Sequence, residues 1–142
     1  MNEKITQIVA VDIIPNAITL DRTADIALTK EPSLNPMAVY LSQLSPSSRR
    51  TMRGALETIA KIVSAGELDA MGFPWAELRY QHTQAIYTQL SERYAFSNAN
   101  KMMAALSRVL EESWKLGLMS AEDYHRAIAI ERKTGQRFRA TA

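Results

Sequence analysis

The sequence contains no cysteine among its 142 residues, which excludes disulfide bonds, thiolate metal sites, iron–sulfur clusters and cysteine nucleophiles. No apolar run reaches the roughly 18 residues that a membrane-spanning helix needs, and the first residues do not lead into the apolar core of a secretory signal. The five glycines form no phosphate-binding loop of the P-loop or Rossmann kind. We therefore expect a cytoplasmic protein with no cofactor, no metal, no small-molecule ligand and no membrane partner.

Side chains suited to catalysis are also scarce. The two histidines are His82 and His125, and neither is followed three or four residues on by the second ligand that a helical metal site needs. We expect both to be partly exposed helix residues. Glu111 and Glu112 would point about 100° apart on a helix, and we expect them to be separate solvated charges. The sequence therefore predicts no catalytic residue in this chain.

Helical periodicity is the strongest pattern that the sequence does contain. Asn35 and Ser45 each precede a proline, an arrangement typical of a capped helix start, and apolar residues follow both at helical spacing. The predicted helices begin at Pro36, at Pro46, at about Arg79, at a cap on Ser97 and at a cap on Ser120, and the second and fourth end near Gly66 and Gly117. Phe73 and Trp75, in the loop before the third helix, are expected to fill the core.

These patterns predict an all-α fold, a compact bundle of four to five helices over residues 36–130. Residues 1–35 show no sustained period, hold three basic and five acidic residues, and are expected to form a loosely ordered arm. Residues 131–142 are expected to form a basic linker or tail, because the stretch from Arg132 onward has four basic and no acidic side chains. On the second helix, one solvated ridge is expected from residues spaced four apart: Arg49, Arg53, Glu57 and Lys61.

Two of the expected helix starts, Ser45–Arg50 and Ser97–Lys101, combine hydroxyl or amide side chains with basic residues. Backbone N–H groups at a helix start lack helical partners and point outward, and Ser, Asn, Arg and Lys side chains can all donate to phosphate oxygens. In a major groove, arginine also pairs with guanine and asparagine with adenine. These starts fit a DNA-contacting surface, although ordinary capped helices with solvated arginines have the same composition.

Four segments of the sequence resemble a known family. They are SPSSRRTM at 45–52, PWAEL at 74–78, YAFSNANKMMAALSRVL at 94–110 and WKLGLM at 114–119. Together they are similar to the N-terminal core-binding domain of tyrosine recombinases, the phage-integrase family, which has a SAM-like fold. The resemblance covers residues 41–124, more than half of the chain.

The resemblance implies a non-catalytic domain that forms one jaw of a clamp around duplex DNA, with two helices addressing the major groove. It also implies a role in DNA integration and recombination, with double-stranded DNA and sister recombinase subunits as partners and a location with the nucleoid. Family catalysis uses a separate C-terminal domain with a His-x-x-Arg motif and a nucleophilic tyrosine, and neither histidine here has an arginine at that spacing. Carried over by position, the DNA-contacting candidates are Ser47, Ser48, Arg49, Arg50, Arg53, Ser97, Asn98, Asn100, Lys101 and Arg108.

A second interpretation of the same helix faces remains open. A helical protein-interaction module, acting as a recombination accessory factor, would also present polar and basic helix starts. Charge reversal at Arg49, Arg50 and Lys101 separates the two, because a DNA-binding module would lose DNA affinity whereas an interaction module would lose only its protein partner.

Overall fold

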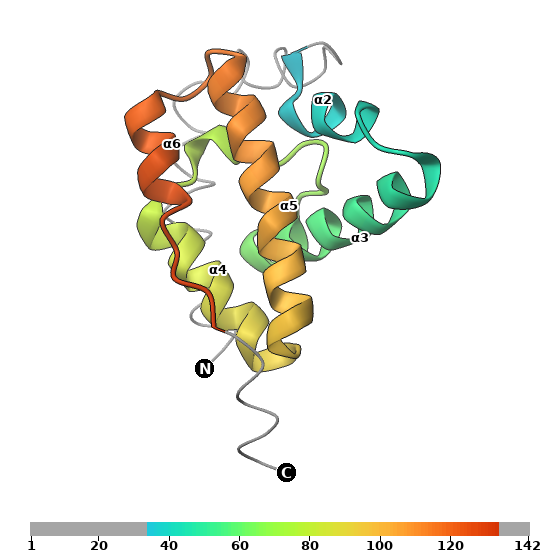
Figure 1. The fold of residues 1–142 in the computed structure, drawn as a ribbon, viewed down its shortest axis with the longest axis vertical. Coiled ribbons are helices and arrows are strands. Elements are labelled where there is room, and N and C mark those ends of the chain that lie inside the picture. Colours follow the sequence, from blue (N-terminus) through green and yellow to red (C-terminus); the bar gives the residue numbers. More distant parts are fainter. Residues whose placement is uncertain (1–33, 134–142) are drawn as a thin grey trace.

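The computed structural model describes residues 34–133, and within them it contains helices and no strand. The predicted all-α fold is therefore confirmed. In chain order the elements are α2 (Pro36–Ser42), α3 (Pro46–Val63), the 3-10 helix η2 (Trp75–Glu77), α4 (Tyr80–Arg93), α5 (Phe96–Lys115) and α6 (Ala121–Ala127), as drawn in Figure 1. The predicted arm lies outside the described residues apart from its last two, and so does most of the predicted tail. No helix between residues 34 and 133 is both long and apolar enough to cross a bilayer.

α5 is the central element of the bundle, because α2, α3, η2, α4 and α6 all pack against it. It runs along the length of the molecule, with α2 and α3 on one side and α4 and α6 on the other (Figure 1). Its buried face passes through Ala99, Met103, Leu106 and Leu110, at the spacing of an amphipathic helix. Burial of each large apolar side chain on this face contributes about 1.5–3 kcal/mol.

Three of the predicted helix starts are confirmed by their capping hydrogen bonds. The Asn35 side chain accepts from two backbone N–H groups of α2, and Ser45 Oγ accepts from the third residue of α3 at 3.4 Å. Ser120 Oγ accepts from the backbone N–H of Asp123 at 3.0 Å, which starts α6. The predicted stop at Gly117 is also confirmed, since its φ of +79° is a conformation that favours glycine.

The start of α5 differs from the prediction. The helix begins at Phe96, its cap position is Ala95, and no side chain caps it, so Ser97 lies inside the first turn. Phe96 lies three residues before Ala99 and seven before Met103, so it shares their buried face when α5 starts at Phe96. Phe96 is only 8% exposed. Burial of Phe96 therefore decides the helix start, and the Ser97 hydroxyl is left for solvent or a ligand.

The loop between α3 and α4 contributes the aromatic core residues that the sequence predicts. Phe73 and Trp75 are each 1% exposed, and their ring centroids lie 4.6 Å apart. Trp75 Nε1 donates to the carbonyl of Ala70 at 2.8 Å, which satisfies the indole N–H inside the core. His82 is buried too, and its Nδ1 accepts from the backbone N–H of Arg79 at 2.9 Å. The expectation of partial exposure is thus wrong for His82, because this ring closes the first turn of α4.

The prediction of a solvated ridge on α3 is wrong for its first residue, Arg49. Arg49 is half-buried, and its guanidinium donates to the carbonyls of Leu41 at 3.0 Å and Leu44 at 2.9 Å. These carbonyls lie at the end of α2, where helical partners run out. Glu57 is also half-buried and accepts from the backbone N–H of Ala70 at 3.2 Å. Arg49 therefore fastens α2 to α3.

Replacing Arg49 by methionine should lower the free energy of unfolding by about 1–3 kcal/mol, because two carbonyls lose a charged donor. Arg50→Met is the matched control: Arg50 is exposed, methionine has nearly the same helix propensity, and a change within about 0.5 kcal/mol is expected. Urea unfolding of both variants measures the difference. Equal stabilities would show that the Arg49 hydrogen bonds contribute nothing net.

Candidate nucleic-acid interface

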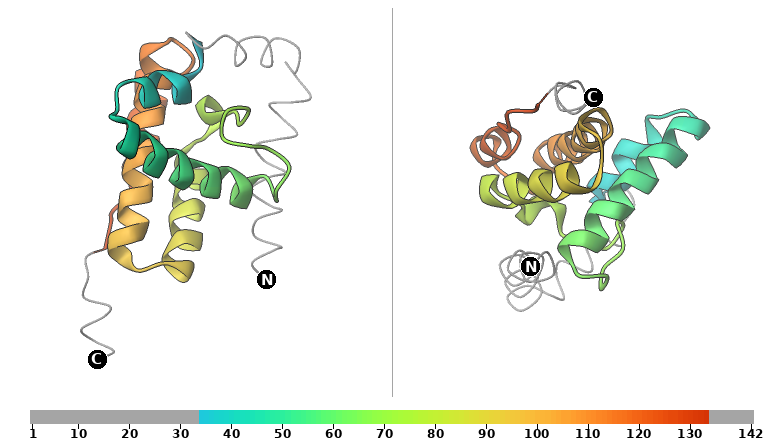
Figure 2. Two further views of the ribbon diagram at one scale, coloured as in Figure 1. Left: turned by 90° about the vertical axis from the view of Figure 1, so that its right-hand side faces the viewer. Right: turned by 90° about the horizontal axis from the view of Figure 1, so that it is seen from below.

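Most of the candidate residues lie exposed on the first halves of α3 and α5. The exposed members are Ser47, Ser48, Arg50, Arg53, Ser97, Asn98 and Lys101. The chain has no acidic residue from Asn35 to Leu56 or from Arg93 to Leu110, so both helix halves carry positive charge alone. Figure 2 shows α3 crossing α5, with the first halves of both helices on the same side of the molecule.

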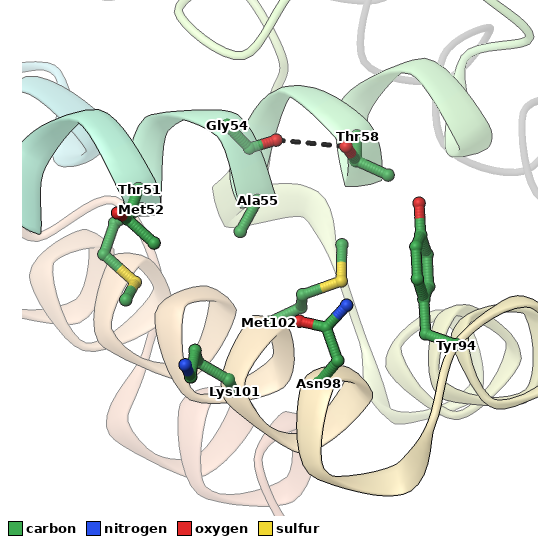
Figure 3. A pocket seen from close by; sticks show the side chains of 9 residues that line it. All are labelled: Thr51, Met52, Gly54, Ala55, Thr58, Tyr94, Asn98, Lys101 and Met102. Atoms are coloured by element: carbon green, nitrogen blue, oxygen red, sulfur yellow. Dashed lines mark hydrogen bonds between the residues drawn. The ribbon is translucent and has the colours of Figure 1, made fainter.

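A groove of about 190 Å³ lies between α3 and α5 and joins the two halves. Asn98 and Lys101 line it from α5, and Figure 3 shows them facing Thr51 and Ala55 across the gap. Tyr94, in the turn before α5, closes one end. The remaining lining residues are Met52, Gly54, Thr58 and Met102. The acid-free first halves of α3 and α5 thus line one concave site. The helix start at Ser97–Lys101 contributes Asn98 and Lys101 to its wall, and the start at Ser45–Arg50 lies next to it along α3.

The two threonine hydroxyl groups along the groove are already committed as donors. Thr51 Oγ1 donates to the carbonyl of Ser47 at 3.2 Å, and Thr58 Oγ1 donates to that of Gly54 at 3.0 Å. Each hydroxyl proton is therefore used inside α3, and toward a ligand these threonines offer oxygen acceptors and methyl groups. Donation to an anion falls to the serine, amide and basic side chains at the two helix starts.

Within residues 34–133, the cations at this site have no carboxylate partners. The ion pairs found within residues 34–133 join Arg79, Arg108, Lys115 and Arg126 to acidic residues, and none involves Arg50, Arg53 or Lys101. Arg53 lies two residues after Thr51, about 200° around the helix, which places it on the flank of α3 away from the groove. Arg50 and Lys101 are therefore the cations best placed beside the groove.

The electrostatics of the two helix starts favour an anionic ligand. Neither α3 nor α5 has an acidic residue in its first turn, and α5 also lacks a side-chain cap. A helix start carries about half a positive charge, so nearby cations such as Arg50 and Lys101 are unfavourable there by a few tenths of a kcal/mol. A phosphate at the site would offset this repulsion and accept hydrogen bonds from the uncapped N–H groups.

Arg108 belongs to a different, intramolecular cluster. It contacts Glu111, donates to Glu112 Oε2 at 3.0 Å and to Gln43 Oε1 at 2.7 Å, and lies over the Tyr40 ring. Burial acts to lower the pKa of Arg108, but its contacts with Glu112 and Glu111 outweigh this and hold the pKa above its ordinary value.

The expectation of separate solvated charges at Glu111 and Glu112 is consequently wrong. The Glu112 side chain is 4% exposed. Arg108 pairs with both carboxylates, which lie three and four residues after it on the same face of α5. Arg108 is thus held by buried and half-buried partners, and we leave it out of the contact set proposed below.

Asn100 is also committed within the fold. Its Oδ1 accepts from the Tyr87 hydroxyl at 2.9 Å, and its Nδ2 donates to the backbone carbonyl of Lys133 at 2.6 Å. Both polar atoms of the amide are therefore used on the side of α5 that faces α4. With Arg49 capping α2, three of the ten candidates have intramolecular roles.

Sequence reasoning missed the residues of α3 that line the groove. Thr51, Gly54 and Thr58 line the groove and follow one another at steps of three and four, which is the spacing of the apolar stripe read on the opposite face. This pattern could have been read in the sequence, because small and polar residues at helical spacing indicate a second stripe on the helix. Tyr94 carried no such signal, since its place depends on how α4 and α5 meet.

Comparisons of the chain with protein-family models, with curated proteins and with solved structures find no match. Within residues 34–133 no three His, Cys, Asp or Glu side chains are grouped as metal ligands. The geometry and charge of the groove and of the two helix halves that line it are therefore the observations that bear on function.

Proposed function

We propose that the chain is a duplex DNA-binding module that grips DNA with the first halves of α3 and α5. One observation carries this proposal: the acid-free first halves of α3 and α5, whose cations have no carboxylate partner within residues 34–133, line the same groove. Binding to DNA depends mainly on cations that neutralise phosphates and release counterions. Arg50 and Lys101 are the cations to which we assign this role.

Individual contacts follow from the chemistry of the exposed side chains. Ser47, Ser48 and Ser97 can donate to phosphate oxygens and fix the register of the protein on the duplex. Arg50 can pair with guanine and Asn98 with adenine where a base edge is in reach. The threonine methyl groups of the groove suit a thymine methyl, a contact that also distinguishes bases.

The biological setting that we propose follows the resemblance of the sequence. A core-binding domain of a tyrosine recombinase would position the recombinase on its DNA site, with sister subunits as further partners and with the nucleoid as its location. Strand cutting is assigned to none of the residues described here. Binding to DNA and membership in a recombinase are separate claims, and the experiment below tests the first.

Titration of the protein with a DNA duplex at increasing salt tests the proposal. Each phosphate contact changes the slope of log Kobs against log[salt] by about −0.9, so Arg50 and Lys101 alone predict a slope of about −1.8 or steeper. Fluorescence anisotropy of a labelled duplex between about 50 and 200 mM salt covers the useful range. Absence of binding at the low-salt end, or a flat slope, would refute DNA binding.

Gly54 provides a second prediction, because nothing in the protein requires a glycine there. It lies in the middle of α3 on the exposed face, and an added Cβ would meet no atom within 4 Å. Gly54→Ala should therefore stabilise the protein by about 0.5–1 kcal/mol through helix propensity. A glycine kept at such cost suits close approach of a ligand, so we expect the same variant to bind DNA roughly tenfold more weakly.

Thr88→Ala on α4 is the matched control for Gly54→Ala. Thr88 is exposed, alanine again improves helix propensity, and the residue lies outside the groove. It should raise the temperature of unfolding without changing DNA affinity. Undiminished DNA affinity of Gly54→Ala would mean that the DNA does not approach the backbone of α3 at this point.

A further inference from the structure

The chain segment that follows α6 is fixed against the bundle. Residues 128–133 run back past α4 toward the start of α5 (Figure 1). Thr83 Oγ1 donates to the carbonyl of Ala127 at 2.7 Å where the segment begins, and the Ile130 side chain is 8% exposed. The course of residues 128–133 is therefore set by contacts with α4 and α5.

Tyr87 and Asn100 form the last of these contacts, which we term the latch. The Tyr87 hydroxyl accepts from the backbone N–H of Lys133 at 2.8 Å and donates to Asn100 Oδ1 at 2.9 Å. Asn100 Nδ2 in turn donates to the Lys133 carbonyl at 2.6 Å. Both backbone polar groups of Lys133 are thereby satisfied, and the Tyr87 side chain is only 3% exposed. The latch holds one residue of the segment at a defined place.

That place brings Lys133 to the start of α5 and Arg132 to the middle of the same helix. Arg132 Nη2 donates to Ser107 Oγ on α5 at 3.1 Å, and Lys133 Nζ lies 5.8 Å from the ring centroid of Phe96, the first residue of the helix. Arg132 and Lys133 are both exposed. Lys101 lies on the α3 side of α5, about 100° around the helix from Asn100, so cations border the start of α5 on both sides.

We propose that Arg132 and Lys133 are phosphate-contacting residues, held beside α5 by the Tyr87–Asn100 latch. The DNA-binding surface then has three parts: α3, α5 and the segment after α6. This inference rests on the proposed function and extends it, because it assigns Asn100 a positioning role instead of a base contact. Holding Arg132 and Lys133 in place before binding reduces the conformational entropy that they lose on contact with DNA.

Removing the two charges in the full chain tests the contact. Arg132→Gln/Lys133→Gln should make the slope of log Kobs against log[salt] shallower by about 1.8, which corresponds to two phosphate contacts. Lys115→Gln/Arg126→Gln is the matched control: it removes the same charge from the other end of α5 and from α6, where both side chains are exposed. The control should keep the slope of the unmodified protein.

Tyr87→Phe tests the latch separately, since it removes the hydroxyl and keeps the buried ring. The charges remain, so we expect roughly threefold weaker binding from lost pre-organisation, with a nearly unchanged salt slope and faster exchange of the Lys133 amide proton. In the Arg132→Gln/Lys133→Gln background the same change should have no further effect on DNA affinity. An equal loss in both backgrounds would show a general structural effect and overturn the positioning role.

The outcomes separate this inference from the proposed function. If the unmodified protein binds no duplex DNA, both fail. If it binds with a steep salt slope that Arg50→Gln/Lys101→Gln reduces and Arg132→Gln/Lys133→Gln does not, the contacts of α3 and α5 stand and the third part of the surface is refuted.

Discussion

Replacing Arg108 by alanine should lower the free energy of unfolding by about 3–5 kcal/mol, because it leaves a buried carboxylate without its cation. Glu112 is that carboxylate: its side chain is 4% exposed, and Arg108 Nη2 lies 3.0 Å from Oε2. Gln43 Nε2 also donates to Oε2, at 3.1 Å, but an amide offers no net charge to balance the carboxylate. The ring of Tyr40, below the guanidinium, would lose a packing partner as well.

A second change should rescue most of this loss. Glu112→Gln in the Arg108→Ala background removes the uncompensated charge, and we expect the double variant to be more stable than Arg108→Ala alone. Arg126→Ala is the matched control, since the pair of Arg126 with Glu122 is exposed on both sides and should contribute less than about 1 kcal/mol. Urea unfolding of the unmodified protein, Arg108→Ala, Glu112→Gln and their double variant measures the coupling, with Arg126→Ala alongside. A loss below about 1 kcal/mol for Arg108→Ala would show that solvent reaches Glu112 and that the buried pair is unimportant.

The helices were predictable because their signals are local, and the details that failed depend on distant residues. Asn35, Ser45 and Ser120 cap their helices as expected, since a cap and the N–H groups it satisfies lie within three residues of each other. Ser97 carries the same local signal, but burial of Phe96 against the core moved the start of α5. A polar cap was thus overridden by an apolar side chain that gains more from burial.

The candidate site shows the same division between local and distant determinants. Exposure of Arg50 and Lys101 follows from the apolar stripes of their own helices, which can be read in the sequence. The pairs of Arg108 with Glu111 and Glu112 lie at i+3 and i+4, a spacing that the sequence offers. The contacts of Arg108 with Gln43 and of Asn100 with Lys133 could not be read there, because these partners are 65 and 33 residues away. Helical periodicity predicts which positions are exposed. It does not predict which residue of another element a half-buried basic or amide side chain contacts, because that depends on how the helices pack.

Neutralising Arg50 and Lys101 together should weaken binding to a DNA duplex by about 10- to 100-fold near 0.1 M salt. This loss corresponds to about 0.7–1.4 kcal/mol for each exposed contact with a phosphate, and the slope of log Kobs against log[salt] should become shallower by about 1.8. Glutamine keeps the length and helix propensity of both side chains. Since neither cation belongs to an ion pair within residues 34–133, stability should change by less than about 0.5 kcal/mol.

Two controls decide what a loss of affinity means. Lys115→Gln/Arg126→Gln removes the same net charge elsewhere, so equal losses in both double variants would indicate a general attraction of a basic protein to DNA, with no defined surface. Arg53→Gln removes a cation from the flank of α3 that faces away from the groove and should have the smaller effect. If Arg50→Gln/Lys101→Gln binds DNA as tightly as its control, the acid-free helix starts serve another partner. Because these substitutions leave the fold intact, a selective loss reports directly on contact between the groove and the DNA.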